Sequence, residues 1–246
     1  MNIVQQFKTF GPVDSKYIRR DDINSLLIVA PFLLALAVRW LLPFILEGIG
    51  ELINFDLFPY FPPIMGYIIM ILMPLFSGMI TGLILLDQKD DRTILGLQVS
   101  PVPMTSYLTY RLATPMLLSL FTTMLVYPIS GLQPIGLLSL FANAVLAMPL
   151  APISAIAFAI FAENKIQGLV LMKASGAILF LPIAAYFLPN VWKYMTAIIP
   201  TFWPGQFYWY ALENNSTQWI IFLAGFAIQL ILIYFLQKLW NKRIHS

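Results

Sequence analysis

The chain has 246 residues, of which 60% are hydrophobic and 10% charged, and its mean hydropathy is +0.82. Soluble domains are nearer half apolar and a quarter charged because they cover themselves with polar groups, so this composition excludes them; it also excludes a disordered chain. The sequence contains no cysteine and one histidine, His245, which leaves no parts for disulfides, thiol catalysis or histidine-based metal sites. We expect an all-α integral membrane protein.

The N-terminal segment, residues 1–22, mixes aromatic and basic side chains before the first long apolar stretch. Its candidate membrane-surface residues are Phe7, Phe10, Tyr17, Arg19 and Arg20. This mixture predicts an interfacial helix, broken at Gly11-Pro12; the alternative is a partly ordered polar lead-in. We treat 1–22 as this interfacial segment and 23–246 as one transmembrane domain.

Six stretches are long and apolar enough to cross a bilayer, which takes about 20 residues of helix. They are Asn24–Leu46, Pro63–Leu86, Ser106–Ser130, Ile135–Ala162, Gly168–Leu188 and Thr217–Gln237. No stretch alternates as a membrane barrel strand does, so we expect six transmembrane helices. Their small residues, among them Gly78, Gly82, Gly168 and Gly176, are predicted to let helices pack closely.

Lysine and arginine are concentrated in every second region outside the predicted spans. The N-terminal segment, the second and fourth loop regions and the C-terminal tail carry 12 of them, whereas the other loops carry only Lys193. Basic residues mark the cytoplasmic side of a membrane, so both termini are expected in the cytoplasm. The net charge of +3 therefore indicates topology and no nucleic-acid partner. The first span, with no signal-peptide pattern before it, is expected to be an uncleaved anchor.

Arg39 is the one ionisable residue that we assign to the inside of a span. It lies about 22 Å along the helix from the inner end, at 1.5 Å per residue. Either it snorkels to the outer boundary, paired with Glu47 or Glu51, or it lines a substrate path. The spans have no buried carboxylate or histidine for a proton or sodium relay, and the chain has no P-loop or other enzyme motif.

The segment 189–214, between the fifth and sixth spans, is rich in aromatic residues and proline. Its candidate residues are Trp192, Pro200, Trp203, Pro204 and Trp209. Aromatic residues of this kind prefer the headgroup zone. We predict an outer re-entrant or interfacial helical hairpin, shielded by protein wherever its backbone breaks.

The loop after the second span combines charged with aliphatic residues. Its candidate docking residues are Asp87, Lys89, Asp90, Asp91, Arg92, Thr93, Ile94, Leu95, Leu97 and Val99. The two adjacent acids at 90–91 are expected at a helix N-terminus, and the aliphatic side chains suit a cleft on a soluble partner. The alternative is a helix lying on the inner leaflet.

This loop resembles the stretch after the second span in permease subunits of type-2 ATP-binding cassette (ABC) exporters. The resemblance rests on the acidic–basic run at 87–92, Thr93-Ile94 with Leu97, Val99-Ser100-Pro101 and Tyr107. The first span and the segment 163–204 are similar to bacterial drug-export permeases of this group, including those linked to fluoroquinolone export. The resemblance extends over nearly the whole chain; Ile94 departs from it, since leucine is more usual there.

The resemblance implies a division of labour. Two copies of a separate cytoplasmic ATPase would bind ATP and magnesium, and two permease subunits, identical or paralogous, would form a 12-span core in the bacterial plasma membrane. Residues 87–101 would form the coupling helix, residues 1–22 the connecting helix, and the outer hairpin would narrow the exit. This chain itself would carry no catalytic residue, metal or cofactor.

We therefore expect an ATP-driven exporter of an amphipathic or hydrophobic substrate, such as a drug, lipid or peptide. The low charge of the spans favours such a cargo over a small ion, and protection against an antimicrobial would fit the resemblance. The candidate pathway residues are Arg39, Met73, Ser77, Thr81, Ser175 and Phe180. Two alternatives stay open: a non-transporting docking or immunity module, and an ATP-independent facilitator.

Overall fold

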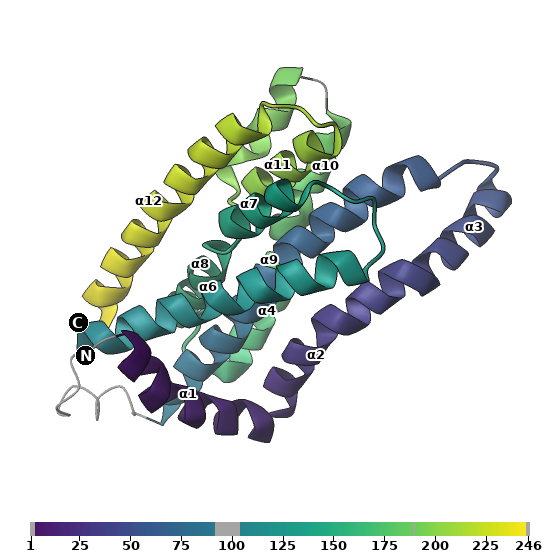
Figure 1. Cartoon of the computed structure of the whole chain (residues 1–246). Coiled ribbons are helices and arrows are strands. Elements are labelled where there is room, and N and C mark those ends of the chain that lie inside the picture. Colours follow the sequence, from purple (N-terminus) through teal and green to yellow (C-terminus); the bar gives the residue numbers. More distant parts are fainter. Residues whose placement is uncertain (1–2, 92–103, 189, 245–246) are drawn as a thin grey trace.

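The computed structural model describes residues 3–91, 104–188 and 190–244, and over these ranges it is helical without a strand (Figure 1). The elements are α1 (Ile3–Arg20), α2 (Asp22–Leu36), the π-helix η1 (Ala37–Leu41), α3 (Leu42–Ile53), η2 (Phe58–Tyr60), α4 (Phe61–Asp90), α6 (Met104–Ile129), α7 (Leu137–Ala147), α8 (Leu150–Phe161), α9 (Lys165–Phe180), η3 (Leu181–Ile183), α10 (Ala184–Phe187), η4 (Asn190–Ile198), α11 (Phe202–Leu212) and α12 (Gln218–Ile244). The all-α prediction is confirmed.

Five helical segments of the described chain are long and apolar enough to cross a membrane. They are Asp22–Ile53, Phe58–Asp90, Ser106–Ile129, Leu137–Phe161 and Gln218–Trp240. They match the first four and the last of the predicted spans. The fifth predicted stretch, 168–188, is divided: α9 ends at Phe180 and the short helices η3 and α10 continue the chain. Pro182 explains the division, because proline lacks an N–H and its ring clashes with the carbonyl four residues earlier.

The stretch predicted as the fourth span also contains a break, between α7 and α8 at Met148-Pro149. Carbonyl groups in the last turn of a helix lack helical N–H donors. Gln229 of α12, which is fully buried, donates from Nε2 to the carbonyl of Leu146 at 3.1 Å. This side chain therefore stabilises the break from a neighbouring helix.

Helix α4 runs through the centre of the bundle and packs against α2, α6, α8 and α11. Its predicted close-packing glycines face α8: a Cβ at Gly78 would overlap Ser154 and the backbone of Ala151, and one at Gly82 would lie 3.0 Å from Phe158. The prediction for these two glycines is confirmed, and Gly168 likewise lies against Leu86. It is wrong for Gly176, where a Cβ would meet no atom within 4 Å.

Helix α1 lies at the end of the bundle where both chain termini are found (Figure 1). The predicted break at Gly11-Pro12 is wrong, since α1 continues from Ile3 through Arg20. Proline removes one helical hydrogen bond, to the residue four positions earlier. Pro12 and Lys8 are both exposed, so water can satisfy the freed carbonyl and the helix need not end.

Candidate functional site

The charged part of the predicted docking loop belongs to the end of α4. This helix continues through Asp90, and Asp91 is its C-cap. The expectation that the two acids begin a helix is therefore wrong for Asp90, which ends one; Asp87 and Lys89 lie in the last turns of the same helix. The other candidates, Arg92, Thr93, Ile94, Leu95, Leu97 and Val99, fall outside the described residues.

A lysine at the start of α9 joins three elements near this end of α4. Lys165 forms ion pairs through Nζ with Asp21, between α1 and α2, and with Asp87 at 3.0 Å. Tyr17 of α1 hydrogen-bonds the same Asp87 carboxylate. We name Tyr17, Asp21, Asp87 and Lys165 the lysine cluster. It ties α1 and α9 to the last turns of α4.

The charges of the lysine cluster stabilise one another. Partial burial alone would lower the pKa of Lys165, but hydrogen bonds and charge from Asp21 and Asp87 outweigh it and raise that pKa above its ordinary value. Partial burial alone would raise the pKa of Asp21, and the bonds from Lys165 and the Asn24 backbone instead lower it. Burial, followed by the bond to Asp87, raises the pKa of Tyr17. The Asp21 carboxylate and the Lys165 ammonium are thus charged at neutral pH.

A second polar cluster holds α1 against α6. Arg111 donates from Nη1 and Nη2 to the two carboxylate oxygens of Asp14, at 2.7 and 3.1 Å. The Tyr110 hydroxyl donates to the same carboxylate at 2.8 Å, and Arg111 Nε donates to the Tyr107 hydroxyl at 3.1 Å. Tyr107 in turn donates to Gln88 of α4. We name these five residues the arginine cluster.

The arginine cluster is buried: Asp14 is 7% exposed and Arg111 5%. A two-pronged contact between a guanidinium and a carboxylate is among the strongest polar contacts in proteins. Losing one partner leaves the other as an uncompensated buried charge, which costs about 3–5 kcal/mol. Through this pair α1 is bound firmly to the first turns of α6.

The aromatic residues predicted for the interfacial helix support this attachment. Phe7 and Phe10 pack on Tyr110 with ring centres 5.1 and 5.2 Å apart, and Phe10 also contacts Tyr107. Together with Asp14 and Tyr17 they form one stripe of α1 at helical spacing. Arg19 and Arg20 are exposed at its last turn. The helix is confirmed; its place at a membrane surface stays a prediction.

Sequence reasoning missed the buried pair, although a signal was present. Arg111 is one of the 12 basic residues assigned to the cytoplasmic side, yet it lies inside the third predicted span, Ser106–Ser130, and the structure buries it in α6. The statement that Arg39 is the one ionisable residue of the spans is therefore wrong. The partner, Asp14, lies 97 positions away, and no local pattern links the two.

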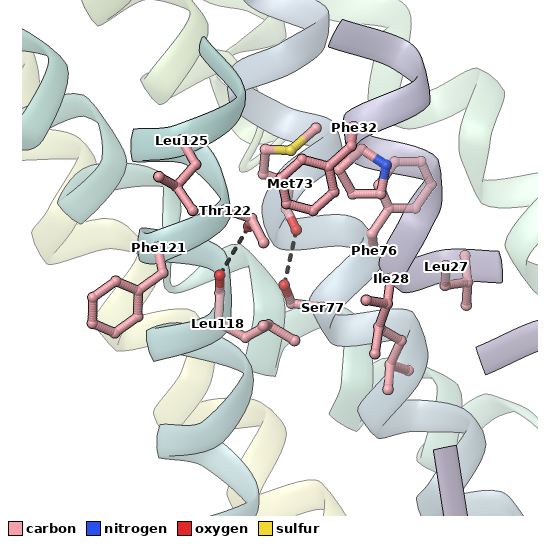
Figure 2. Close-up of a pocket in the computed structure, with 12 residues that line it drawn as sticks. Leu27, Ile28, Phe32, Met73, Phe76, Ser77, Leu118, Phe121, Thr122 and Leu125 are labelled. Carbon is pink, nitrogen blue, oxygen red and sulfur yellow. Dashed lines mark hydrogen bonds between the residues drawn. The ribbon is translucent and has the colours of Figure 1, made fainter. Parts of the chain in front are cut away.

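The candidate pathway residues that the structure describes lie in separate places. Met73 and Ser77 line an apolar pocket between α2, α4 and α6 (Figure 2), and Thr81 is buried on α4 outside that lining. Phe180, at the end of α9, is half-buried against the main core. The side chain of Ser175 lies outside the described part of the chain.

Arg39 reaches towards the far end of α6. Its Nη1 donates to the carbonyl of Ile129 at 3.3 Å, and its guanidinium lies 5.5 Å from the ring centre of Trp40. Neither Glu47 nor Glu51 is its partner in the ion pairs found among the described residues. The arginine therefore bridges the first and third predicted spans.

The aromatic segment between the fifth and sixth predicted spans is folded into the bundle. Of its candidates, Trp203, Pro204 and Trp209 are buried on α11, Pro200 is half-buried, and Trp192 on η4 is 59% exposed. Trp209 donates through Nε1 to the carbonyl of Pro63 at 3.0 Å, and Tyr208 to that of Pro62 at 3.1 Å.

Helix α11 thus adds two hydrogen bonds to carbonyls in the first turn of α4. Tyr67 adds a 3.3 Å hydrogen bond to Thr201, immediately before α11, and stacks on Trp209 with ring centres 5.5 Å apart. The start of α4 is Phe61-Pro62-Pro63. The carbonyls of its two prolines lie beside the phenol of Tyr208 and the indole of Trp209. That the segment 189–214 lies on the outer side of the membrane and is re-entrant stays a prediction.

Five apolar helices long enough to span a bilayer, with charged side chains buried at one end of the bundle, define a multi-pass membrane protein. The chain belongs to the family described as fluoroquinolones export permease protein Rv2686c-like, whose model matches residues 14–237. The predicted resemblance to drug-export permeases is thereby confirmed.

Two relatives from Mycobacterium tuberculosis extend the similarity over almost the whole chain. They are the fluoroquinolones export permease proteins Rv2686c, of strain ATCC 25618 / H37Rv, and MT2760, of strain CDC 1551 / Oshkosh. This chain is 28% identical to each over 236 residues, which cover 95% of this chain and 93% of each relative. No solved structure matches it.

Proposed function

We propose that this chain is the transmembrane subunit of an ATP-driven ABC exporter in a bacterial plasma membrane. Its cargo is an amphipathic drug of the fluoroquinolone kind. Family membership supports export of such a drug, because both relatives carry that activity in their names. The lysine cluster and the arginine cluster supply the physical argument that a separate ATPase drives transport.

The observation that carries the proposal is the position of these clusters beside residues 92–103. Helix α4 ends immediately before this segment and α6 begins immediately after it. Gln88 and Asp87 at the end of α4, and Tyr107 and Arg111 at the start of α6, are bonded to each other or to α1. Through these contacts a displacement of 92–103 would be passed to α1, α4 and α6.

We assign residues 87–101 as the docking segment for a separate ATPase present in two copies, which holds ATP and magnesium. The sequence has no P-loop, and in this proposal ATP is hydrolysed by the partner. For coupling, the ATP-bound and free states of the partner must hold the segment differently. The aliphatic residues Ile94, Leu95 and Leu97 are the side chains that would enter its surface.

The chain crosses the membrane six times in this proposal, with both termini in the cytoplasm. Both termini lie at the same end of the bundle (Figure 1), which requires an even number of crossings, whereas five helices meet the length criterion. The predicted stretch 168–188, which covers most of α9 together with η3 and α10, supplies the sixth. The excess of lysine and arginine at the ends of alternate spans supports the orientation, which places η4 and α11 on the outer side as a re-entrant hairpin.

Two permease subunits form the transport path in this proposal. The pathway candidates Arg39, Ser77 and Phe180 lie in separate parts of one subunit. A path that includes them needs a second surface, which another copy or a paralogue would provide. The apolar exposed faces of the peripheral helices are compatible with that contact.

The docking assignment is tested by the double substitution Leu95→Asp with Leu97→Asp in the tagged chain. The matched control is Leu95→Ile with Leu97→Ile, which keeps the apolar surface. We expect the ATPase to co-purify with the wild type and the isoleucine variant and to be lost from the aspartate variant, with all three monodisperse in detergent. Association retained by the aspartate variant would show that the partner docks elsewhere.

The alternatives give different results in the same preparation. A docking or immunity module would bind a soluble protein without any nucleotide-dependent movement of drug. A facilitator would move drug across vesicles that contain this chain alone. Family membership among export permeases argues against the first.

A further inference from the structure

An apolar pocket of about 260 Å³ lies between α2, α4 and α6 (Figure 2). Its twelve lining residues come from these three helices and include Leu27, Ile28, Met73, Ser77, Phe121 and Thr122. Two of its lining residues, Met73 and Ser77, are pathway candidates, but the proposed function places no molecule in this pocket. An engineered cavity of about 150 Å³ already holds a benzene molecule, so this pocket is large enough for a substantial apolar group.

The lining offers no donor to a ligand. Its two hydroxyl groups are turned to their own helices: Ser77 donates to the carbonyl of Met73 at 3.0 Å, and Thr122 to that of Leu118 at 2.8 Å. The other ten lining residues have no polar side-chain group except the thioether of Met73. A charged ligand would lose its hydration there without compensation, and water would find too few partners. The occupant must be apolar.

The pocket opens sideways, on the surface that faces the membrane. Ile28 on α2 is 37% exposed, and Phe121 and Leu125 on α6 are 64% and 55% exposed. Both helices belong to candidate membrane spans that lie at the periphery of the bundle, in contrast to the central α4. Where a second subunit does not cover this face, the molecules that meet the opening are the hydrocarbon chains of lipids.

Two exposed arginines end α1, just before the helix that supplies the first pocket residues. Arg19 and Arg20 are exposed at the end of α1, next to the start of α2, and belong to none of the ion pairs among the described residues. Leu27, the first lining residue, lies five positions after the start of α2, or about 8 Å along the helix. A lipid phosphate beside the arginines can therefore send an acyl chain into the pocket.

We propose that this pocket binds one acyl chain of an anionic phospholipid, whose phosphate lies at Arg19 and Arg20. An empty apolar pocket forfeits dispersion contacts along its lining, and the acyl chain restores them. The lipid thereby fills the gap between α2, α4 and α6. The inference rests on the membrane location of the chain and does not depend on the identity of the exported drug.

The test uses the full-length chain in vesicles of phosphatidylethanolamine and phosphatidylglycerol. The probe is a phosphatidylglycerol with a photoreactive diazirine in the middle of one acyl chain, and its adducts are mapped by mass spectrometry. We expect adducts concentrated on the pocket stretches of α2, α4 and α6, at least fivefold above those on the exposed face of α12. Adducts spread evenly over all exposed faces would overturn the proposal.

Pocket-filling substitutions separate specific binding from general lipid contact. Thr122→Phe should lower pocket adducts at least fivefold, and the smaller Thr122→Leu should lower them partly if the larger side chain prevents folding. The matched control is Leu117→Phe, on the same helix and exposed but outside the lining, which should leave them within twofold of wild type. Equal labelling in the Thr122 and Leu117 variants would contradict the assignment.

Two further arms test the headgroup and the source of the occupant. Arg19→Gln with Arg20→Gln should lower pocket labelling by the anionic probe several-fold; unchanged labelling would refute the placement of the phosphate. Unlabelled phosphatidylglycerol should displace the probe from the pocket and a fluoroquinolone should not. Selective displacement of the probe by the drug would show that the pocket binds the exported drug and would overturn the lipid assignment. If drug export alone failed in a separate transport assay, the lipid result would be unaffected.

Discussion

The buried pair between Asp14 and Arg111 makes the attachment of α1 measurable. The substitution Asp14→Asn keeps the size of the side chain and removes its charge, leaving the guanidinium of Arg111 buried beside a neutral amide. Removal of one member of a buried ion pair costs about 3–5 kcal/mol. For a chain of this size 1 kcal/mol corresponds to about 2–4 °C in the unfolding midpoint. We therefore expect a decrease of about 6–20 °C.

The assay is thermal unfolding of the purified chain in detergent, with Asp22→Asn as the matched control. Asp22 is exposed in the first turn of α2, where a charge is worth about 0.3–1 kcal/mol. The double variant Asp14→Leu with Arg111→Met removes both charges and should recover much of the loss. Equal shifts for Asp14→Asn and Asp22→Asn would refute the reasoning, as would a double variant less stable than the sum of its single variants predicts.

Three other predictions follow from the clusters, the topology and the packing. Lys165→Met should destabilise the chain at neutral pH. The difference in unfolding free energy between wild type and this variant should become smaller as pH falls from 3.8, the ordinary pKa of Asp21, through the lowered pKa of Asp21 in the folded chain. It should also become smaller as pH rises from 10.5, the ordinary pKa of Lys165, through the raised pKa of Lys165. A difference independent of pH across both limits would contradict the pairing. In intact cells a membrane-impermeant thiol reagent should label Ser216→Cys and spare Ser15→Cys, two exposed positions in a chain without native cysteine; the opposite pattern would invert the topology. Gly78→Ala should lower the unfolding midpoint by several degrees because its Cβ overlaps α8, whereas Gly176→Ala, with free space, should leave it unchanged or raise it; equal losses would show that Gly78 is not at a tight helix contact.

Hydropathy predicted the long helices well because a bilayer imposes a length and an apolar composition on each span. The charge of the N-terminal segment likewise indicated a separate helix before the first span. The same pattern could not reveal the division of the stretch 168–188 into α9, η3 and α10. Hydropathy averages over a window, and the break depends on one residue, Pro182, inside a run that is otherwise apolar.

The candidate site was predictable only where it is local. The charges at 87–91 and the stripe of Phe7, Phe10 and Tyr17 could be read from the chain, since their members are close in sequence. The pairing of Asp14 with Arg111 joins residues 97 positions apart and follows from the packing of α1 on α6. The contact of Trp209 with Pro63 has the same origin, because α11 folds back against the start of α4.

Drug transport in reconstituted vesicles tests the central claim most directly. The chain and its co-purified ATPase are placed in vesicles, with the nucleotide-binding side facing outward, and uptake of a fluorescent fluoroquinolone is followed with ATP, without ATP, and with an ATPase variant that cannot hydrolyse it. The account predicts uptake against a gradient only when ATP is hydrolysed, and loss of that uptake in the Leu95→Asp, Leu97→Asp variant. Equal drug movement in all three conditions, or none in any of them with the ATPase bound and active, would contradict it.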